Sequence, residues 1–140
     1  MSEERDQFRQ RVEALVEQVR RWVKPRQRLT KPYPKKMRDV DRQVFEILAL
    51  SLQKGPTRVL LDPVAYDVPG SEGVVDLYRM PTYDDLASLC LEDQHWVIHY
   101  TFPPDSVETR SLGEMQALPL SEATINQVLD AITAHAAPSV

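Results

Sequence analysis

Apolar residues in the first 24 positions repeat at steps of three and four. The stripe consists of Phe8, Val12, Leu15, Val16, Val19, Trp22 and Val23. This spacing is typical of an amphipathic helix with one buried face. Pro25 ends the pattern, because the residue before a proline resists helical geometry. We therefore expect a helix over residues 1–24.

A second helix is expected over residues 37–54, after an extended connection at residues 25–36 that contains three prolines. Its apolar positions again follow a helical spacing, and they are Met37, Val40, Val44, Ile47 and Leu48. The pair Gly55-Pro56 is a strong signal for the end of a helix, since glycine favours the position after the last turn and proline cannot continue it.

From residue 58 the apolar pattern becomes that of β-strands, with short apolar or alternating runs. Runs at residues 58–62 and 74–80 flank the turn sequence PGSEG. The segment TYDDLASLCLED fits either a helix or a strand. HWVIHYTF follows it, alternates strictly and is rich in β-branched and aromatic residues. This favours a hairpin of residues 86–92 with 96–102, followed by a loop at residues 103–119.

The last element has the clearest start signal. Ser121 fits an N-cap, and Leu120 with Ile125 forms a hydrophobic staple, which predicts a helix over residues 121–135. The element order is then ααββββα. Short connections between strands favour an antiparallel meander. We therefore predict one α+β domain over residues 1–140: a four-stranded antiparallel sheet at residues 58–102, with two N-terminal helices and one C-terminal helix packed on one face.

The composition narrows the class of protein. The 140 residues are 42% hydrophobic and 27% charged, as expected of a soluble globular domain. No apolar run approaches the roughly 20 residues that span a bilayer, and no secretory signal is visible. Cys90 is the only cysteine, which excludes an internal disulfide and favours a cytoplasmic location. We expect no membrane association and no cofactor.

Familiar catalytic and metal-binding motifs are weak or absent. The four glycines form neither a G-x-G-x-x-G loop nor a P-loop, the two familiar nucleotide-binding loops. His95 and His99 would lie about 13 Å apart on a strand, too far to share a metal, so we expect no metal site. A dyad of Cys90 with a histidine of the next strand is a minor alternative. Another remote alternative is a metal-dependent hydrolase that uses the sheet carboxylates Asp62, Asp67, Asp76, Asp84 and Asp85.

Charge is distributed unevenly along the chain. Residues 1–58 carry 15 Lys or Arg and 8 Asp or Glu, whereas residues 59–140 carry 2 and 13, for a net charge of -4. Nine of the cations lie between Arg20 and Arg38 without one carboxylate among them. Such asymmetry indicates an acidic partner for the basic segment, or attraction between the two halves of the chain.

Three interpretations of this basic segment remain open. The first, which we favour, is a non-enzymatic interaction protein that docks an acidic protein partner. The second is a nucleic-acid-binding accessory protein in which Trp22 and Tyr33 stack on bases. The third is a linker neutralised by the acidic half of the same chain. A homodimer is compatible with each. The expected binding residues are Arg26, Arg28, Lys31, Tyr33, Lys35, Lys36 and Arg38.

Overall fold

The computed structural model describes every residue except 1, 40, 69–70, 82–83, 101–115 and 137–140. Its helices are α1 (Ser2–Val23), the short 3-10 helix η1 (Lys24–Arg26) and α2 (Glu122–Ala136). The strands are β1 (Leu29–Arg38), β2 (Val44–Lys54), β3 (Thr57–Val68), β4 (Ser71–Met80), β5 (Asp84–Glu92), β6 (His95–Tyr100) and β7 (Gln116–Pro119).

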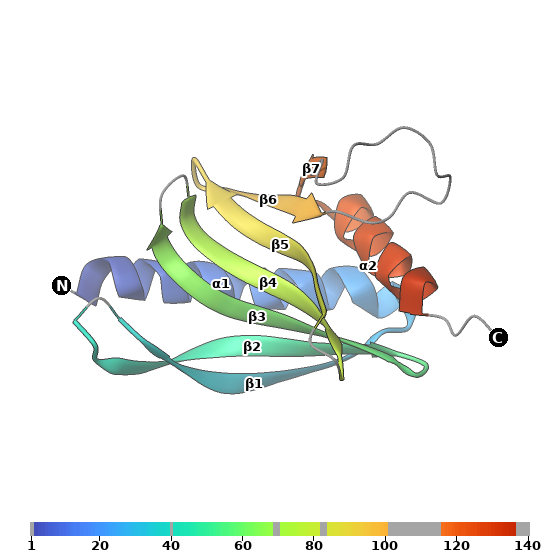
Figure 1. Cartoon of the computed structure of the whole chain (residues 1–140), viewed down its shortest axis with the longest axis horizontal. Coiled ribbons are helices and arrows are strands. Elements are labelled where there is room, and N and C mark those ends of the chain that lie inside the picture. The colour runs from blue at the N-terminus through green and yellow to red at the C-terminus, as the bar shows by residue number, and fades with distance from the viewer. Residues whose placement is uncertain (1, 40, 69–70, 82–83, 101–115, 137–140) are drawn as a thin grey trace.

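The described strands form one antiparallel sheet in which each strand pairs with its neighbours in sequence, β1 to β7. Figure 1 shows α1 running along the sheet behind β3 and β4, with α2 beside β6. One core joins the helices to the sheet, with Val12 and Val16 from α1, Leu61 and Leu89 from the sheet, and Leu129 from α2. The opposite, outer face of the sheet carries no helix in the described part of the chain.

The α+β class is confirmed, but the predicted four-stranded sheet with three helices is wrong, because the structure has seven strands and two α-helices within the described residues. The predicted helix at residues 37–54 is the end of β1 followed by β2. The members of the core cluster in β2 step from Ile47 to Leu50 and then to Leu52, and Ala49 between them is also buried. The three-residue step between Ile47 and Leu50 imitates helical spacing.

Gly55 and Pro56 form a hairpin turn rather than the end of a helix. They lie between Lys54 and Thr57, which pair across β2 and β3. Gly55 has φ of 58°. A two-residue hairpin turn with glycine first, at positive φ, is a preferred connection between twisted antiparallel strands. The dipeptide Gly-Pro is therefore compatible with the end of a helix and with a hairpin turn, and the predicted helix end was wrong.

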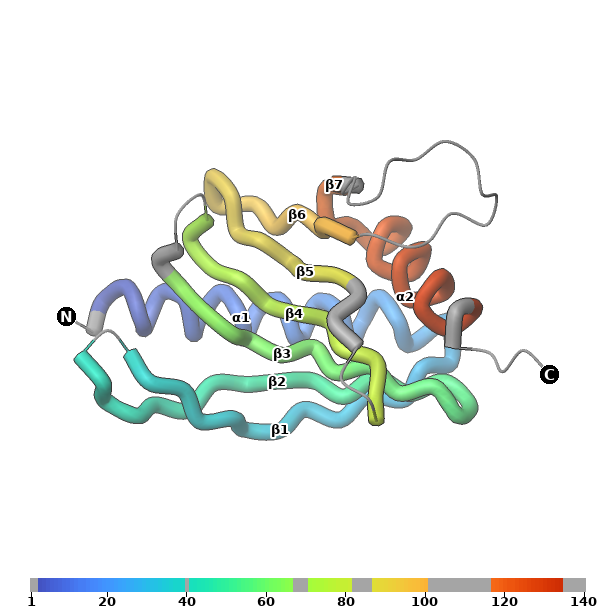
Figure 2. The backbone as a smooth tube through the Cα atoms, viewed as in Figure 1, coloured from blue at the N-terminus to red at the C-terminus, as the bar shows by residue number. Residues whose placement is uncertain are grey.

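Much of the predicted connection at residues 25–36 belongs to β1, which lies at one edge of the sheet (Figure 2). Pro32 and Pro34 lie inside this strand, opposite Leu50 and Leu48. Proline suits an edge strand where its nitrogen faces the open side, because no ladder hydrogen bond is lost there. Prolines and lysines on an exposed edge also discourage pairing with another chain. This gives part of the basic, proline-rich composition a structural cause.

Two contacts fix α1 against the sheet. Asp39, in the turn after β1, accepts hydrogen bonds from the backbone N–H groups of Asp41 and Gln43 and pairs with Arg5 of α1 at 3.1 Å. Gly73 of β4 lies beneath the ring of Phe8, so close that a Cβ at this position would lie 2.5 Å from Phe8 Cε1. The first contact joins α1 to the β1–β2 hairpin, and the second allows α1 to approach β4.

The predicted first helix, last helix and 86–92/96–102 hairpin are confirmed in the described residues. Ser121 caps α2 by accepting a hydrogen bond from the backbone N–H of Thr124 at 3.1 Å. β5 pairs with β6 from Ala87–Tyr100 to Glu92–His95. Residues 101–115 of the predicted strand end and loop lie outside the described residues, and 116–119 form β7. No described helix has the length and apolar character needed to cross a membrane.

Candidate functional site

Two of the predicted binding residues contact the acidic half of the chain at α2. The side chain of Arg28 is 1% exposed, and its Nη2 lies 2.7 Å from Asp130 Oδ1. Its Nη1 lies 3.4 Å from Thr133 Oγ1, also on α2. The more exposed Arg26 contacts the other oxygen of the same carboxylate at 3.3 Å. The buried Arg28 therefore joins the start of β1 to α2 and offers little surface to a partner.

Two further cations of β1 also have partners within the chain. Lys35 Nζ lies 2.8 Å from Asp62 Oδ1 and also donates to the carbonyl of Pro63, both on β3. Arg38 donates to the carbonyl of Arg42 in the hairpin turn at 3.1 Å. Lys36 is exposed and forms no ion pair with a residue that the structure describes. The basic segment is thus partly neutralised internally.

Lys31 and Tyr33 line an open groove of about 550 Å³. Its lining comes from three adjacent strands, β1, β2 and β3, and consists of Leu29, Thr30, Lys31, Tyr33, Ser51, Gln53, Arg58 and Leu60. The described lining residues of this groove include two cations and no carboxylate. Leu29, at one end of this groove, is 73% exposed. The groove therefore combines positive charge with an apolar side chain that is open to solvent.

A second groove, of about 400 Å³, meets the first at Leu29 and Thr30, which line both. Its other lining residues come from α1, η1 and the start of β1, and are Glu17, Arg20, Arg21, Lys24 and Arg28. Glu17 is the one carboxylate among its described lining residues and is paired with Arg20 at 3.1 Å. We call the two grooves together the Leu29 surface.

Four cations of the Leu29 surface form no ion pair with any described carboxylate: Arg21, Lys24, Lys31 and Arg58. Only Lys31 belongs to the predicted binding set. Sequence reasoning missed Arg58 because it lies on β3, beyond a stretch that was predicted to be a helix. Arg58 of β3 stands opposite Gln53 of β2, which in turn stands opposite Leu29 of β1. The strand assignment of residues 44–54 was the signal needed to find it.

A second candidate site lies on the outer face, where a polar row crosses four strands. Asp62, Asp76, Ser88 and His99 stand opposite one another on β3 to β6. Asp76 accepts hydrogen bonds from Ser88 Oγ at 2.7 Å and from Tyr78 Oη at 2.8 Å. Because Asp62 is paired with Lys35, both sheet carboxylates already have partners. The side chains of Asp67, Asp84 and Asp85, also proposed for a metal, lie outside the described part.

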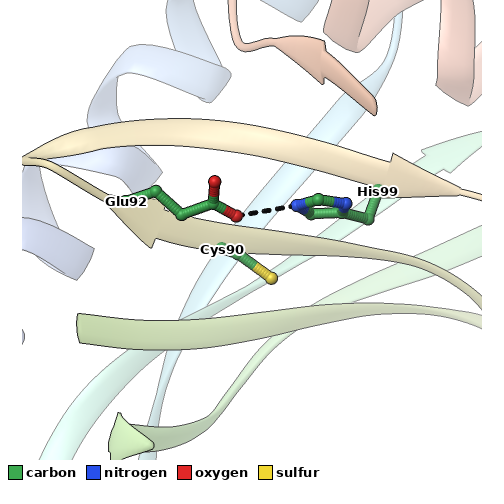
Figure 3. A group of neighbouring side chains, drawn as sticks. All are labelled: Cys90, Glu92 and His99. Carbon is green, nitrogen blue, oxygen red and sulfur yellow. Dashed lines mark hydrogen bonds and ion pairs between the residues drawn. The ribbon is translucent and has the colours of Figure 1, made fainter. Parts of the chain in front are cut away.

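Cys90, Glu92 and His99 form a compact cluster beside this row (Figure 3). Cys90 and Glu92 are two residues apart on β5 and share its outer face, and His99 comes from β6. The possible metal-ligating atoms of the three side chains all lie within 4.8 Å of one another. His99 Nε2 lies 2.8 Å from Glu92 Oε2. The cluster therefore combines nitrogen, oxygen and sulfur ligands at one half-exposed place.

The cluster has a negative electrostatic environment. Burial raises the pKa of the Cys90 thiol, and the carboxylates of Glu92 and Asp76 raise it further. The thiol is thus held in its protonated form. This environment opposes a Cys–His nucleophile, which needs the thiolate, whereas it favours the approach of a cation.

The predicted hairpin contained most of the information needed to find this cluster. Its alternation placed Cys90 and Glu92 on one face of β5, and His99 on the same face of β6. His95 and His99 do not come together in the cluster, as the strand spacing predicted. The pairing of Cys90 with a histidine of the next strand was already a minor alternative, and the ligand that was missed is the carboxylate of Glu92.

Comparison of the chain with protein-family models, curated proteins and solved structures found no match. Function is therefore argued from the geometry of the Leu29 surface and of the outer-face cluster.

Proposed function

We propose that this protein is a non-enzymatic interaction module that docks an acidic protein segment on the Leu29 surface. The observation that supports the proposal most strongly is the group of four cations around Leu29 without carboxylate partners among the described residues. Complementary charge across an interface speeds association and rejects partners of the wrong sign. The partner should therefore carry several Asp or Glu residues.

The exposed side chain of Leu29 specifies the partner further. It lies where the two grooves meet, so an apolar residue on the partner would be flanked on both sides by cations. Burial of apolar surface contributes roughly 25 cal/mol for each Å² removed from water. We infer an acidic segment with at least one large apolar residue near its centre.

Docking by side chains is favoured over addition of a strand to the sheet. An added strand would pair with the open side of β1, but Pro32 and Pro34 remove two donors from that strand. The grooves, in contrast, are lined mainly by side chains of β1 to β3 and α1. The partner segment would therefore lie across the edge of the sheet, and it would not extend the sheet.

A protein partner is favoured over nucleic acid by the aromatic residues. Trp22, which only the nucleic-acid interpretation would stack on bases, packs against the core, as its place in the apolar stripe of the first helix indicates. Tyr33 is the single aromatic residue that lines the described Leu29 surface, and an exposed leucine occupies its centre. Binding of single strands usually relies on several aromatic platforms. The cytoplasmic location is part of the proposal and is supported by the single cysteine.

Fluorescence anisotropy would test the proposal. The probes are a labelled peptide with Asp and Glu around a central Leu, the same peptide with Ser in place of the acids, and a single-stranded RNA. We expect the acidic peptide alone to bind, and the double variant Lys31→Glu/Arg58→Glu to weaken binding by about tenfold or more. Lys36→Glu is the matched control, because it reverses an exposed charge of β1 outside both grooves.

The outcomes separate the alternatives. An equal loss of affinity in Lys36→Glu and in the double variant would indicate general charge attraction and contradict a defined site. Absence of binding of the acidic peptide would also contradict the proposal. Preferential RNA binding with an affinity that falls steeply with salt would favour the nucleic-acid interpretation.

A further inference from the structure

We propose that Cys90, Glu92 and His99 form a binding site for a zinc-type divalent cation on the outer face of the sheet. The proposal does not depend on the acidic partner, because β5 lies four strands from β1, about 19 Å at the usual strand spacing. Three side chains from two paired strands supply one sulfur, one oxygen and one nitrogen ligand (Figure 3).

The arrangement is close to what zinc needs. Zinc binds cysteine sulfur at about 2.3 Å and histidine nitrogen and carboxylate oxygen at about 2.0–2.2 Å. Ligand atoms around a tetrahedral ion therefore lie roughly 3.3–3.7 Å apart. Here they lie within 4.8 Å of one another, with His99 and Glu92 already at 2.8 Å. Small side-chain rotations at this half-exposed position suffice to place all three around one ion.

The surroundings favour a cation and select its class. Asp76 and Glu92 place negative charge beside Cys90, and a bound metal would convert the thiol to a coordinated thiolate. A set of one thiolate, one imidazole and one carboxylate suits zinc or cobalt, whereas magnesium and calcium prefer oxygen ligands alone. Three protein ligands leave a fourth position for water, the pattern of catalytic zinc sites as opposed to closed structural ones.

Titration of the reduced protein with Co²⁺ tests the site, because a cobalt–thiolate bond gives a charge-transfer absorption band. We expect a band that saturates at one cobalt per chain and disappears when Zn²⁺ is added. Cys90→Ser should remove the band, and His99→Gln and Glu92→Gln should each weaken binding by about tenfold or more. His95→Gln is the matched control, since it changes a histidine of the same hairpin outside the cluster.

Circular dichroism of each variant checks that the fold is retained, and a thermal shift with Zn²⁺ gives a second readout. The wild-type protein should gain thermal stability on addition of Zn²⁺, and Cys90→Ser should gain none. Absence of a charge-transfer band in the wild-type protein would overturn the proposal. A band that persists unchanged in both His99→Gln and Glu92→Gln would also overturn it, because it would show binding to an exposed thiol alone.

Discussion

The guanidinium of Arg28 lies 2.7 Å from the carboxylate of Asp130, and this contact joins the middle of the basic segment to the last helix. It divides the segment into residues with different tasks. Arg28 is buried and belongs to the framework, whereas Lys31, three residues later, is exposed in a groove. Similar side chains in one basic segment therefore contribute to stability in one case and to the proposed docking surface in the other.

Removal of the Asp130 carboxylate should destabilise the fold. Asp130→Ala leaves the buried Arg28 without its charged partner, so the free energy of unfolding should fall by about 1.5–3 kcal/mol. The free energy of unfolding of Asp130→Asn should lie between those of Asp130→Ala and the wild type. Arg26→Ala removes the exposed half of the same contact and should change stability by less than about 1 kcal/mol. Urea denaturation measures all three, and an equal cost for Arg26→Ala would contradict the framework role of Arg28.

The Asp39 turn should make stability depend on acid pH. Burial alone would raise the pKa of the Asp39 carboxyl, but the backbone N–H groups of Gln43 and Asp41 and the guanidinium of Arg5 outweigh it and hold the pKa below its usual value. A lowered pKa in the folded state contributes stability above the unfolded value of about 3.9, and this contribution is lost as the pH falls through the folded pKa.

Asp39→Asn tests this dependence, because it keeps a side-chain oxygen as acceptor and removes the charge. We expect the variant to be less stable than the wild type at neutral pH, with a difference that shrinks as the solution is acidified below pH 4. Glu46→Gln, an exposed carboxylate of β2, is the control. Urea titrations across this pH range give the comparison, and a difference that is constant with pH would refute the role of the charge.

Because Gly73 lies against the Phe8 ring, a single methyl group added at Gly73 should lower the free energy of unfolding. Gly73→Ala would place a Cβ 2.5 Å from the Phe8 ring, so we expect a loss of about 1–3 kcal/mol. In a Phe8→Leu background the added cost should be smaller, which a double-mutant cycle measures. Gly55→Ala meets no atom within 4 Å but has φ of 58°. Its cost should therefore be the same in both backgrounds.

Replacement of the edge prolines should promote self-association. Pro32→Thr/Pro34→Thr restores two backbone donors on β1, the open edge of the sheet. Sedimentation velocity should show a larger fraction of dimers or higher species than for the wild type at every concentration. Pro25→Ala, in η1, is the control and should sediment as the wild type does. If the double variant also sediments like the wild type, the prolines do not protect the edge.

Sequence patterns predicted the elements whose buried positions keep one period throughout. The stripe of α1 from Phe8 to Val23 and the alternation through Leu89 and Ile98 are of this kind, and each buried residue agrees with it. β2 breaks its alternation between Ala49 and Leu50, which are adjacent in the chain and both buried. A single sequence contains no signal that separates such a strand from a helix.

The candidate sites were only partly predictable, because some of their residues come together through strand pairing and not through local sequence. Lys31 and Tyr33 were identified from local composition, but Arg58 comes to the Leu29 surface only through the β1–β2–β3 pairing. The Asp130 carboxylate that neutralises Arg28 lies 102 residues away in the sequence. Contacts at such separations depend on the whole topology, so charge counts alone could not divide the cations into paired and unpaired groups.

The order of the core residues along the chain has a consequence for synthesis. Each strand that the structure describes pairs with its neighbours in sequence, so these strands can assemble from local hairpins as the chain leaves the ribosome. Ile125, Leu129 and Ile132 of α2, however, complete the same core and follow the whole sheet in the chain. Until α2 is translated, the apolar surface of α1 and β6 that it covers stays exposed, and exposed apolar surface of this kind makes a folding intermediate prone to aggregation.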